Sequence, residues 1–95
     1  MGVSQPARFG EDWSDERVRG YLNREAPAGE NPDFHALMTA YKHMRPHDFE
    51  RFIAFFKATG RDVNARNGLD LSLLDIVRTH PKSGDFVAIL EAAQG

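Results

Sequence analysis

The amino-acid sequence predicts an all-α fold of about five short helices. Apolar residues recur at intervals of three and four in separate stretches, and helix-capping residues, glycines or prolines bound these stretches. No segment shows the sustained apolar–polar alternation of a strand. With 95 residues, the chain has the length of one small domain. We expect residues 13–95 to form a single helical domain and the aperiodic residues 1–12 to form a flexible N-terminal arm.

The first predicted helix follows Ser14. A serine suits the N-cap position, and the two acidic residues after it complement the positive end of the helix dipole. Val18, Tyr21 and Leu22 then supply one apolar face. Gly20 inside this stretch weakens it by roughly 1 kcal/mol relative to alanine, so we expect the helix to depend on packing.

The second predicted helix follows a loop with two prolines and a glycine. Asn31 is a good N-cap, and Pro32 fits the first helical position. The helix should end near Met44, because Pro46 disfavours helical geometry at the residue before it. Its apolar face consists of Phe34, Leu37, Met38 and Tyr41.

The third predicted helix starts at Pro46 and ends at Gly60, which supplies the left-handed conformation of a helix C-terminus. Its apolar face is unusually broad, because four phenylalanines fall within eight residues. We therefore expect it to be the most buried helix, contacted on two sides. These four residues are Phe49, Phe52, Phe55 and Phe56.

Two further helices are predicted after a turn-rich connector. Ser72 and Asp75 have the spacing of a capping box, which indicates a short fourth helix that stops at His80 and Pro81. Asp85 is expected to cap the fifth helix. Its apolar face consists of Phe86, Ile89, Leu90 and Ala93.

The connector from Gly60 to Asn67 has the sequence pattern G-x-D-V-N-A-x-N. This pattern resembles the end of an ankyrin repeat. Residues 72–77 take the place of the family's T-P-L-H-x-A motif, with Leu73 in place of the proline and Asp75 in place of the histidine. The resemblance covers roughly residues 32–93. It implies two antiparallel helix pairs, with the helix after Ser14 as an N-terminal cap. The whole chain also resembles small, functionally uncharacterised proteobacterial proteins, which implies no particular activity.

An ankyrin-like scaffold implies a protein–protein interaction module. We expect binding through the turn at residues 60–67 and an adjacent basic surface. Residues 34–67 carry six basic and three acidic side chains, so an acidic partner surface would be complementary. The residues predicted to contact the partner are Arg61, Arg66, Asn67, Lys42 and Arg45.

Two alternatives remain open. One is a structural homodimer formed through the aromatic face, without a separate ligand. The other, less favoured, is a helix-turn-helix nucleic-acid binder. Its recognition helix would start at Ser72, where Leu73 and Leu74 stand in place of the polar residues that read bases. The net charge of −2 does not favour nucleic-acid binding, which relies on excess positive charge.

The motifs of catalysis and of cofactor binding are missing from the sequence. There is no G-x-S-x-G, no H-E-x-x-H and no phosphate-binding glycine loop. His43 and His47 have the spacing of zinc ligands on a helix, but Pro46 lies between them, and the chain has no cysteine. We therefore expect no enzyme activity, no cofactor and no metal. No apolar run is long enough for a membrane span and no signal peptide is evident, so we expect a cytoplasmic protein.

Overall fold

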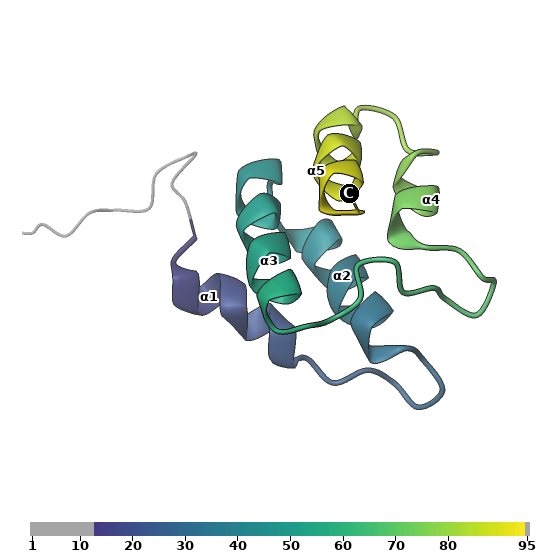
Figure 1. Cartoon of the computed structure of the whole chain (residues 1–95), viewed down its shortest axis with the longest axis horizontal. Coiled ribbons are helices and arrows are strands. Elements are labelled where there is room, and N and C mark those ends of the chain that lie inside the picture. Colours follow the sequence, from purple (N-terminus) through teal and green to yellow (C-terminus); the bar gives the residue numbers. More distant parts are fainter. Residues whose placement is uncertain (1–12, 95) are drawn as a thin grey trace, which may run out of the picture.

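The computed structural model describes residues 13–94, and these residues form an all-α fold, as predicted (Figure 1). They contain five α-helices, one short 3-10 helix (η1) and no β-strand. The predicted N-terminal arm, residues 1–12, lies outside the described residues. The elements in chain order are α1 (Asp15–Gly20), η1 (Tyr21–Asn23), α2 (Pro32–His43), α3 (Pro46–Ala58), α4 (Leu73–Val77) and α5 (Gly84–Gln94).

The helix starts follow the capping signals of the sequence. Ser14 Oγ accepts a hydrogen bond from the Arg17 N–H at 3.1 Å, and α1 starts at the next residue, Asp15. Asn31 Oδ1 accepts from the first backbone N–H groups of α2, at 2.8 and 3.2 Å. Ser72 and Asp75 form the complete capping box at α4. Side chains that satisfy unpaired N–H groups therefore set these three boundaries.

The predicted N-cap of α5, Asp85, was wrong by two residues, because the residue before the helix is Ser83. The helix starts at Gly84, so Asp85 lies within its first turn, where its charge still favours the helix dipole. Ser83 precedes the helix, but its hydroxyl donates to the carbonyls of Val77 and His80, at 2.8 and 2.7 Å. The buried serine thus supplies a hydrogen-bond donor to the last carbonyl of α4 and stabilises the turn between α4 and α5.

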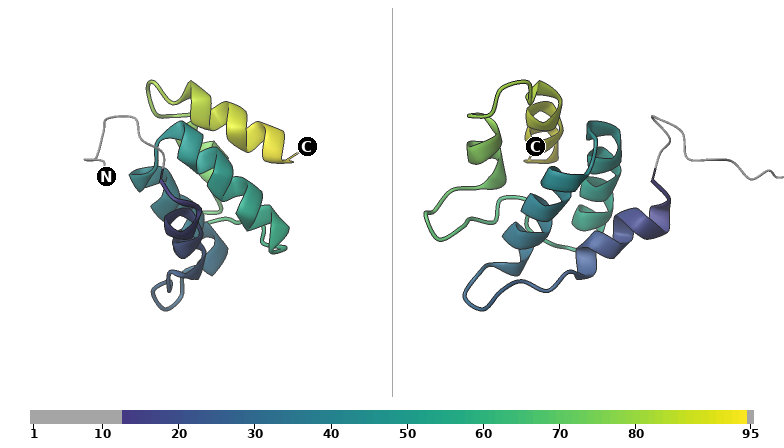
Figure 2. Two further views of the ribbon diagram at one scale, coloured as in Figure 1. Left: turned by 90° about the vertical axis from the view of Figure 1, so that its left-hand side faces the viewer. Right: turned by 180° about the vertical axis from the view of Figure 1, so that it is seen from behind.

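Helix α3 lies at the centre of the molecule. It contacts α1, α2 and α5, which confirms the prediction that it is packed on more than one side. The helices α2 and α3 form an antiparallel hairpin, and α5 lies along α3 while α4 lies beside α2 (Figure 1, Figure 2). At the α2–α4 contact, the Tyr41 hydroxyl and His80 Nδ1 are 2.7 Å apart. The C-terminal ends of these two helices are therefore adjacent.

The aromatic face of α3 forms the core. Phe49, Phe52 and Phe56 are fully buried, and Phe55 is partly covered by the guanidinium of Arg19, which lies 4.6 Å from the ring centroid. The aromatic surface on which the homodimer alternative depended is therefore packed within one chain. The other buried apolar residues include Val18, Phe34, Leu37, Leu73, Leu74, Val77 and Leu90.

A buried carboxylate attaches the start of α1 to α3. Asp48, in the first turn of α3, is fully buried, and its Oδ1 accepts from the backbone N–H of Trp13 at 3.2 Å. Arg45 and Arg51 donate to the same carboxylate, at 3.0 to 3.2 Å. Arg51 also donates to the Trp13 carbonyl at 2.7 Å and pairs with Asp15. Buried charges require such compensation, and here it positions α1 on the core.

Candidate functional site at the connector between α3 and α4

The connector starts with a complete helix-ending motif. Gly60 has φ +83°, a conformation that costs glycine little. Its N–H donates to the Lys57 carbonyl at 2.9 Å, and the next N–H, of Arg61, reaches back to the Phe56 carbonyl at 3.3 Å. This pair of bonds is the Schellman motif, and it turns the chain sharply away from α3.

Arg61 lies against the protein, and its predicted exposure at the tip of the connector was wrong. Its Nε donates to Asp33 Oδ1 at 2.7 Å, and its terminal nitrogens donate to the carbonyls of Leu22 at 2.5 Å and Pro32 at 3.3 Å. The guanidinium also lies 4.9 Å from the ring centroid of Phe56. Only 20% of the side chain is exposed. Arg61 therefore joins the connector to η1 and to the start of α2.

The next residues anchor the connector to the core. Asp62 Oδ1 accepts from the Asn64 N–H at 2.8 Å, which forms an Asx turn. This turn directs Val63 and Ala65 inward, where both are buried. Val63 and Ala65 are therefore the two apolar anchors of the connector.

The chain then projects as a short loop, residues 66–71, which we call the tip loop. An isolated antiparallel bridge between Arg66 and Ser72 closes its base. The Asn67 side-chain oxygen accepts from the N–H groups of Leu69 and Leu71, at 2.8 and 3.0 Å. The backbone of Asn67 bonds Leu71 and Asp70, both at 2.9 Å. One asparagine therefore holds most of the loop's backbone in a single shape.

The tip loop presents an apolar side chain that the sequence analysis missed. Leu69 is 78% exposed, the highest value among the large hydrophobic residues of the described chain, and the nearby Leu71 is also exposed. Asp70 between them has φ +66°, a left-handed conformation that aspartate tolerates better than most residues. The available signal was G-L-D-L-S at residues 68–72, in which apolar residues alternate outside any helical period.

Of the two predicted contact residues that lie in the tip loop, Arg66 is well exposed and Asn67 is not. The Arg66 side chain is 54% exposed and donates to the Asp70 carbonyl at 3.0 Å. Asn67 is only partly exposed, and its amide oxygen is occupied by the loop backbone. Asn67 thus shapes the loop rather than offering a free contact.

Lys42 and Arg45 are not brought to the tip loop, so the predicted continuous basic surface was wrong. Because α2 and α3 are antiparallel, these two residues lie at the opposite end of the hairpin from Gly60. The 13 residues of α3 separate the two ends by about 20 Å. Arg45 is also bound to Asp48.

Helix α4 starts directly after the tip loop and is fixed by its capping box. The Ser72 N–H donates to Asp75 Oδ2 at 3.0 Å, and this bond lowers the pKa of the Asp75 carboxyl below its ordinary value. Leu73 and Leu74, which follow the cap, are buried in the core. These are the residues with which the recognition helix of the helix-turn-helix alternative would begin.

Within residues 13–94, no helix is long and apolar enough to cross a membrane. The same part of the chain contains no group of three or more His, Cys, Asp or Glu residues arranged to hold a metal ion. His43, one of the two histidines with zinc-like spacing, has its Nδ1 2.9 Å from the Thr39 carbonyl.

Comparison with known proteins returned no match: no protein-family model, no curated protein and no solved structure is significantly similar to this chain.

Proposed function

We propose that this chain is a small protein–protein interaction module that binds its partner through the tip loop. The observation that carries the proposal is the exposure of Leu69 on a loop whose backbone is already held in place. Binding through such a loop costs little conformational entropy, because the bonds of Asn67 and the Arg66–Ser72 bridge exist before the partner arrives.

The chemistry of the loop indicates the kind of partner. Leu69 suits a shallow apolar pocket, and complete burial of a leucine contributes roughly 1.5–3 kcal/mol. Arg66 lies in the same loop and adds a cation, which favours a carboxylate beside that pocket. We therefore infer a protein or peptide partner with an apolar pocket and an acidic rim. The proposed contact residues are Leu69, Leu71 and Arg66, while Arg61 and Asn67 position the loop.

The ankyrin-like interpretation remains part of this proposal. The order of the helix pairs, with α3 beside α5 and α2 beside α4, supports it. So does the placement of the connector at the end of α3, since ankyrin proteins bind partners through such projecting turns.

The test uses three versions of the full-length chain as bait in partner capture, namely wild type, a double variant with Leu69→Asp and Arg66→Glu, and Lys42→Glu. The double variant changes only exposed side chains of the tip loop, so it should fold and lose the partner. Lys42→Glu is the control, because it reverses a charge on an exposed lysine at the far end of α2. Recovery of the same partner by the wild type and the double variant would contradict the proposal.

A further inference from the structure

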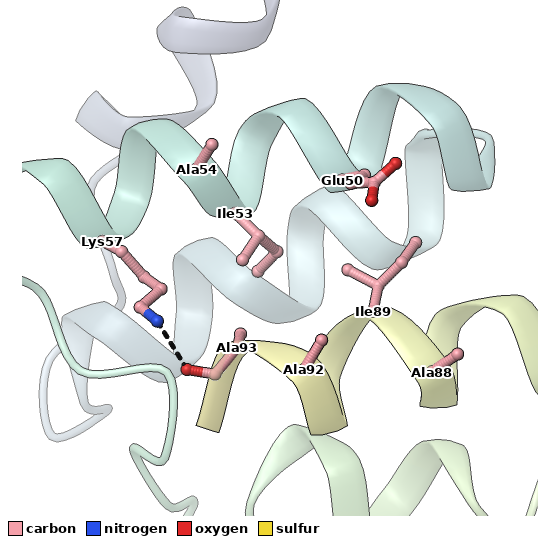
Figure 3. Close-up of a pocket in the computed structure, with 8 residues that line it drawn as sticks. All are labelled: Glu50, Ile53, Ala54, Lys57, Ala88, Ile89, Ala92 and Ala93. Atoms are coloured by element: carbon pink, nitrogen blue, oxygen red, sulfur yellow. Dashed lines mark hydrogen bonds between the residues drawn. The ribbon is translucent and has the colours of Figure 1, made fainter. Parts of the chain in front are cut away.

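An open groove runs between α3 and α5, away from the tip loop. Its wider half holds about 310 Å³ and its narrower half about 260 Å³, and the two halves share Glu50, Ala88 and Ile89 (Figure 3). The lining is mostly apolar and small, with Ile53 and Ile89 between alanines of both helices. Such a surface allows another helix to approach closely, because alanine side chains leave room for the backbone.

The two ends of the groove carry opposite charge. Helices α3 and α5 run in the same direction, so Glu50 and Asp85 lie at the end where both helices start, and Lys57 lies at the other end. The ion pairs found among the described residues do not include Glu50 or Asp85. The Lys57 ammonium group donates to the carbonyl of Ala93 at 2.7 Å, at the C-terminal end of α5.

We propose that a second copy of this chain covers this groove with its own α3–α5 face. A two-fold axis perpendicular to the two helices would reverse the helix direction of the second copy and bring the same surface of both copies together. The acidic end of each copy then faces the Lys57 end of the other. The charge separation suits this pairing, because Glu50 and Lys57 are seven residues apart in sequence, about 10 Å along one helix.

The energetics assign different roles to the two kinds of contact. The apolar centre, around Ile89 and the flanking alanines, supplies the burial that stabilises the dimer. The charged ends supply the register, since a parallel arrangement would bring like charges together. The surface differs from the buried aromatic face and uses none of the tip-loop residues, so the inference is independent of the proposed function.

The experiment measures the mass of the full-length chain by sedimentation equilibrium at low ionic strength, over a wide concentration range. The wild type should show a reversible monomer–dimer equilibrium. Lys57→Glu alone and Glu50→Lys alone should each raise the dimer dissociation constant at least tenfold, because each places like charges at both ends of the interface. An equimolar mixture of the two variants should dimerise again, because each chain then offers the charge that the other lacks.

Lys42→Glu is the matched control, since Lys42 lies in the last turn of α2 as Lys57 does in α3, but not in the groove. Its dissociation constant should equal that of the wild type. Circular dichroism melting shows whether each variant is folded. Three results would overturn the inference: a monomeric wild type at every concentration, a dimer that neither groove variant weakens, or single variants that fail to associate when mixed.

Discussion

Arg61 and Arg66 lie in the same connector, five residues apart, and serve different purposes. Arg61 donates to the carboxylate of Asp33 and to two backbone carbonyls that lie far away in sequence. Arg66 bonds only within its own loop and leaves about half of its side chain in solvent. The hydrogen-bond acceptors within reach, and not the residue type, therefore decide that Arg61 stabilises the fold and that Arg66 stays exposed at the surface.

This difference predicts unequal effects on stability. Arg61→Ala should lower the free energy of unfolding by about 1–3 kcal/mol, because it removes the donor to the Leu22 carbonyl and leaves Asp33 with the Asp62 N–H as its remaining donor from the connector. Arg66→Ala should change it by less than about 0.5 kcal/mol, as is usual for exposed positions. Urea unfolding of the two variants and the wild type provides the measurement. Equal losses would show that Arg61 does not hold the connector in place.

At the scale of single elements, α4 shows how a very short helix persists. It has five residues, far fewer than an isolated helix needs in water. Its capping box satisfies the first N–H groups, Ser83 satisfies carbonyls at its end, and three of its residues lie in the core. Caps and packing therefore replace intrinsic helix propensity. The same helix fixes the chain at the end of the tip loop.

The capping box predicts that the free energy of unfolding depends on pH. In the folded chain the pKa of Asp75 lies below its ordinary value, because the Ser72 N–H bonds the ionised form. Between the folded and unfolded pKa values, the unfolded chain binds more protons. The stability contributed by Asp75 is therefore present above the ordinary pKa of about 3.9 and lost as the pH falls below it.

Asp75→Asn removes this contribution and isolates it from the other carboxylates. At pH 6 the variant should be less stable than the wild type, and the difference should shrink as the pH is lowered toward 2.5. Urea unfolding of both proteins across this range gives the two curves. A stability difference that stays constant with pH would contradict the role assigned to the Asp75 charge.

For the whole molecule, α3 is the helix on which most of the remaining structure depends. Its aromatic face fills the core, its first turn holds Trp13 through Asp48, and its C-terminus starts the connector. The groove beside α5 uses another side of the same helix. A dimer through that groove would carry two tip loops, and a partner with two matching sites would bind it with increased avidity.

The central position of α3 predicts large effects in its core. Phe52→Ala and Phe56→Ala should each lower the free energy of unfolding by roughly 3–5 kcal/mol, because both rings are fully buried. Phe55→Ala is the internal control and should cost clearly less, since Phe55 is only partly buried beneath Arg19. Thermal melting of the three variants measures the ranking. Unchanged midpoints for Phe52→Ala and Phe56→Ala would contradict the assignment of α3 as the core.

Most of the fold could be predicted because its signals are local. Ser14, Asn31 and Ser72 cap helices through bonds to backbone two or three residues away, and Gly60 ends α3 through its own backbone conformation. Asp85 was misplaced because the helical bonds of α5 already start at the Ser83 carbonyl, which accepts from the Val87 N–H, while the Ser83 hydroxyl bonds the end of α4.

The shape and the exposed side chains of the connector could not be predicted in the same way. The connector motif pointed to residues 60–67, and Arg66 is exposed there as expected. The engagement of Arg61 with Asp33 and the distance between the tip loop and Lys42 depend on the direction of helices that are far apart in sequence. Leu69 was missed because exposure is a property of the folded surface.

The sequence by itself determined the number of α-helices, their boundaries to within about three residues, and the central role of α3. Short-range hydrogen bonds and apolar periodicity suffice for these, since both act within one or two helical turns. Only the tertiary structure decided which charged side chains pair within the chain and which leucine is exposed. It also decided that an apolar groove with charged ends lies between α3 and α5. These depend on the distances between elements, which no local pattern encodes.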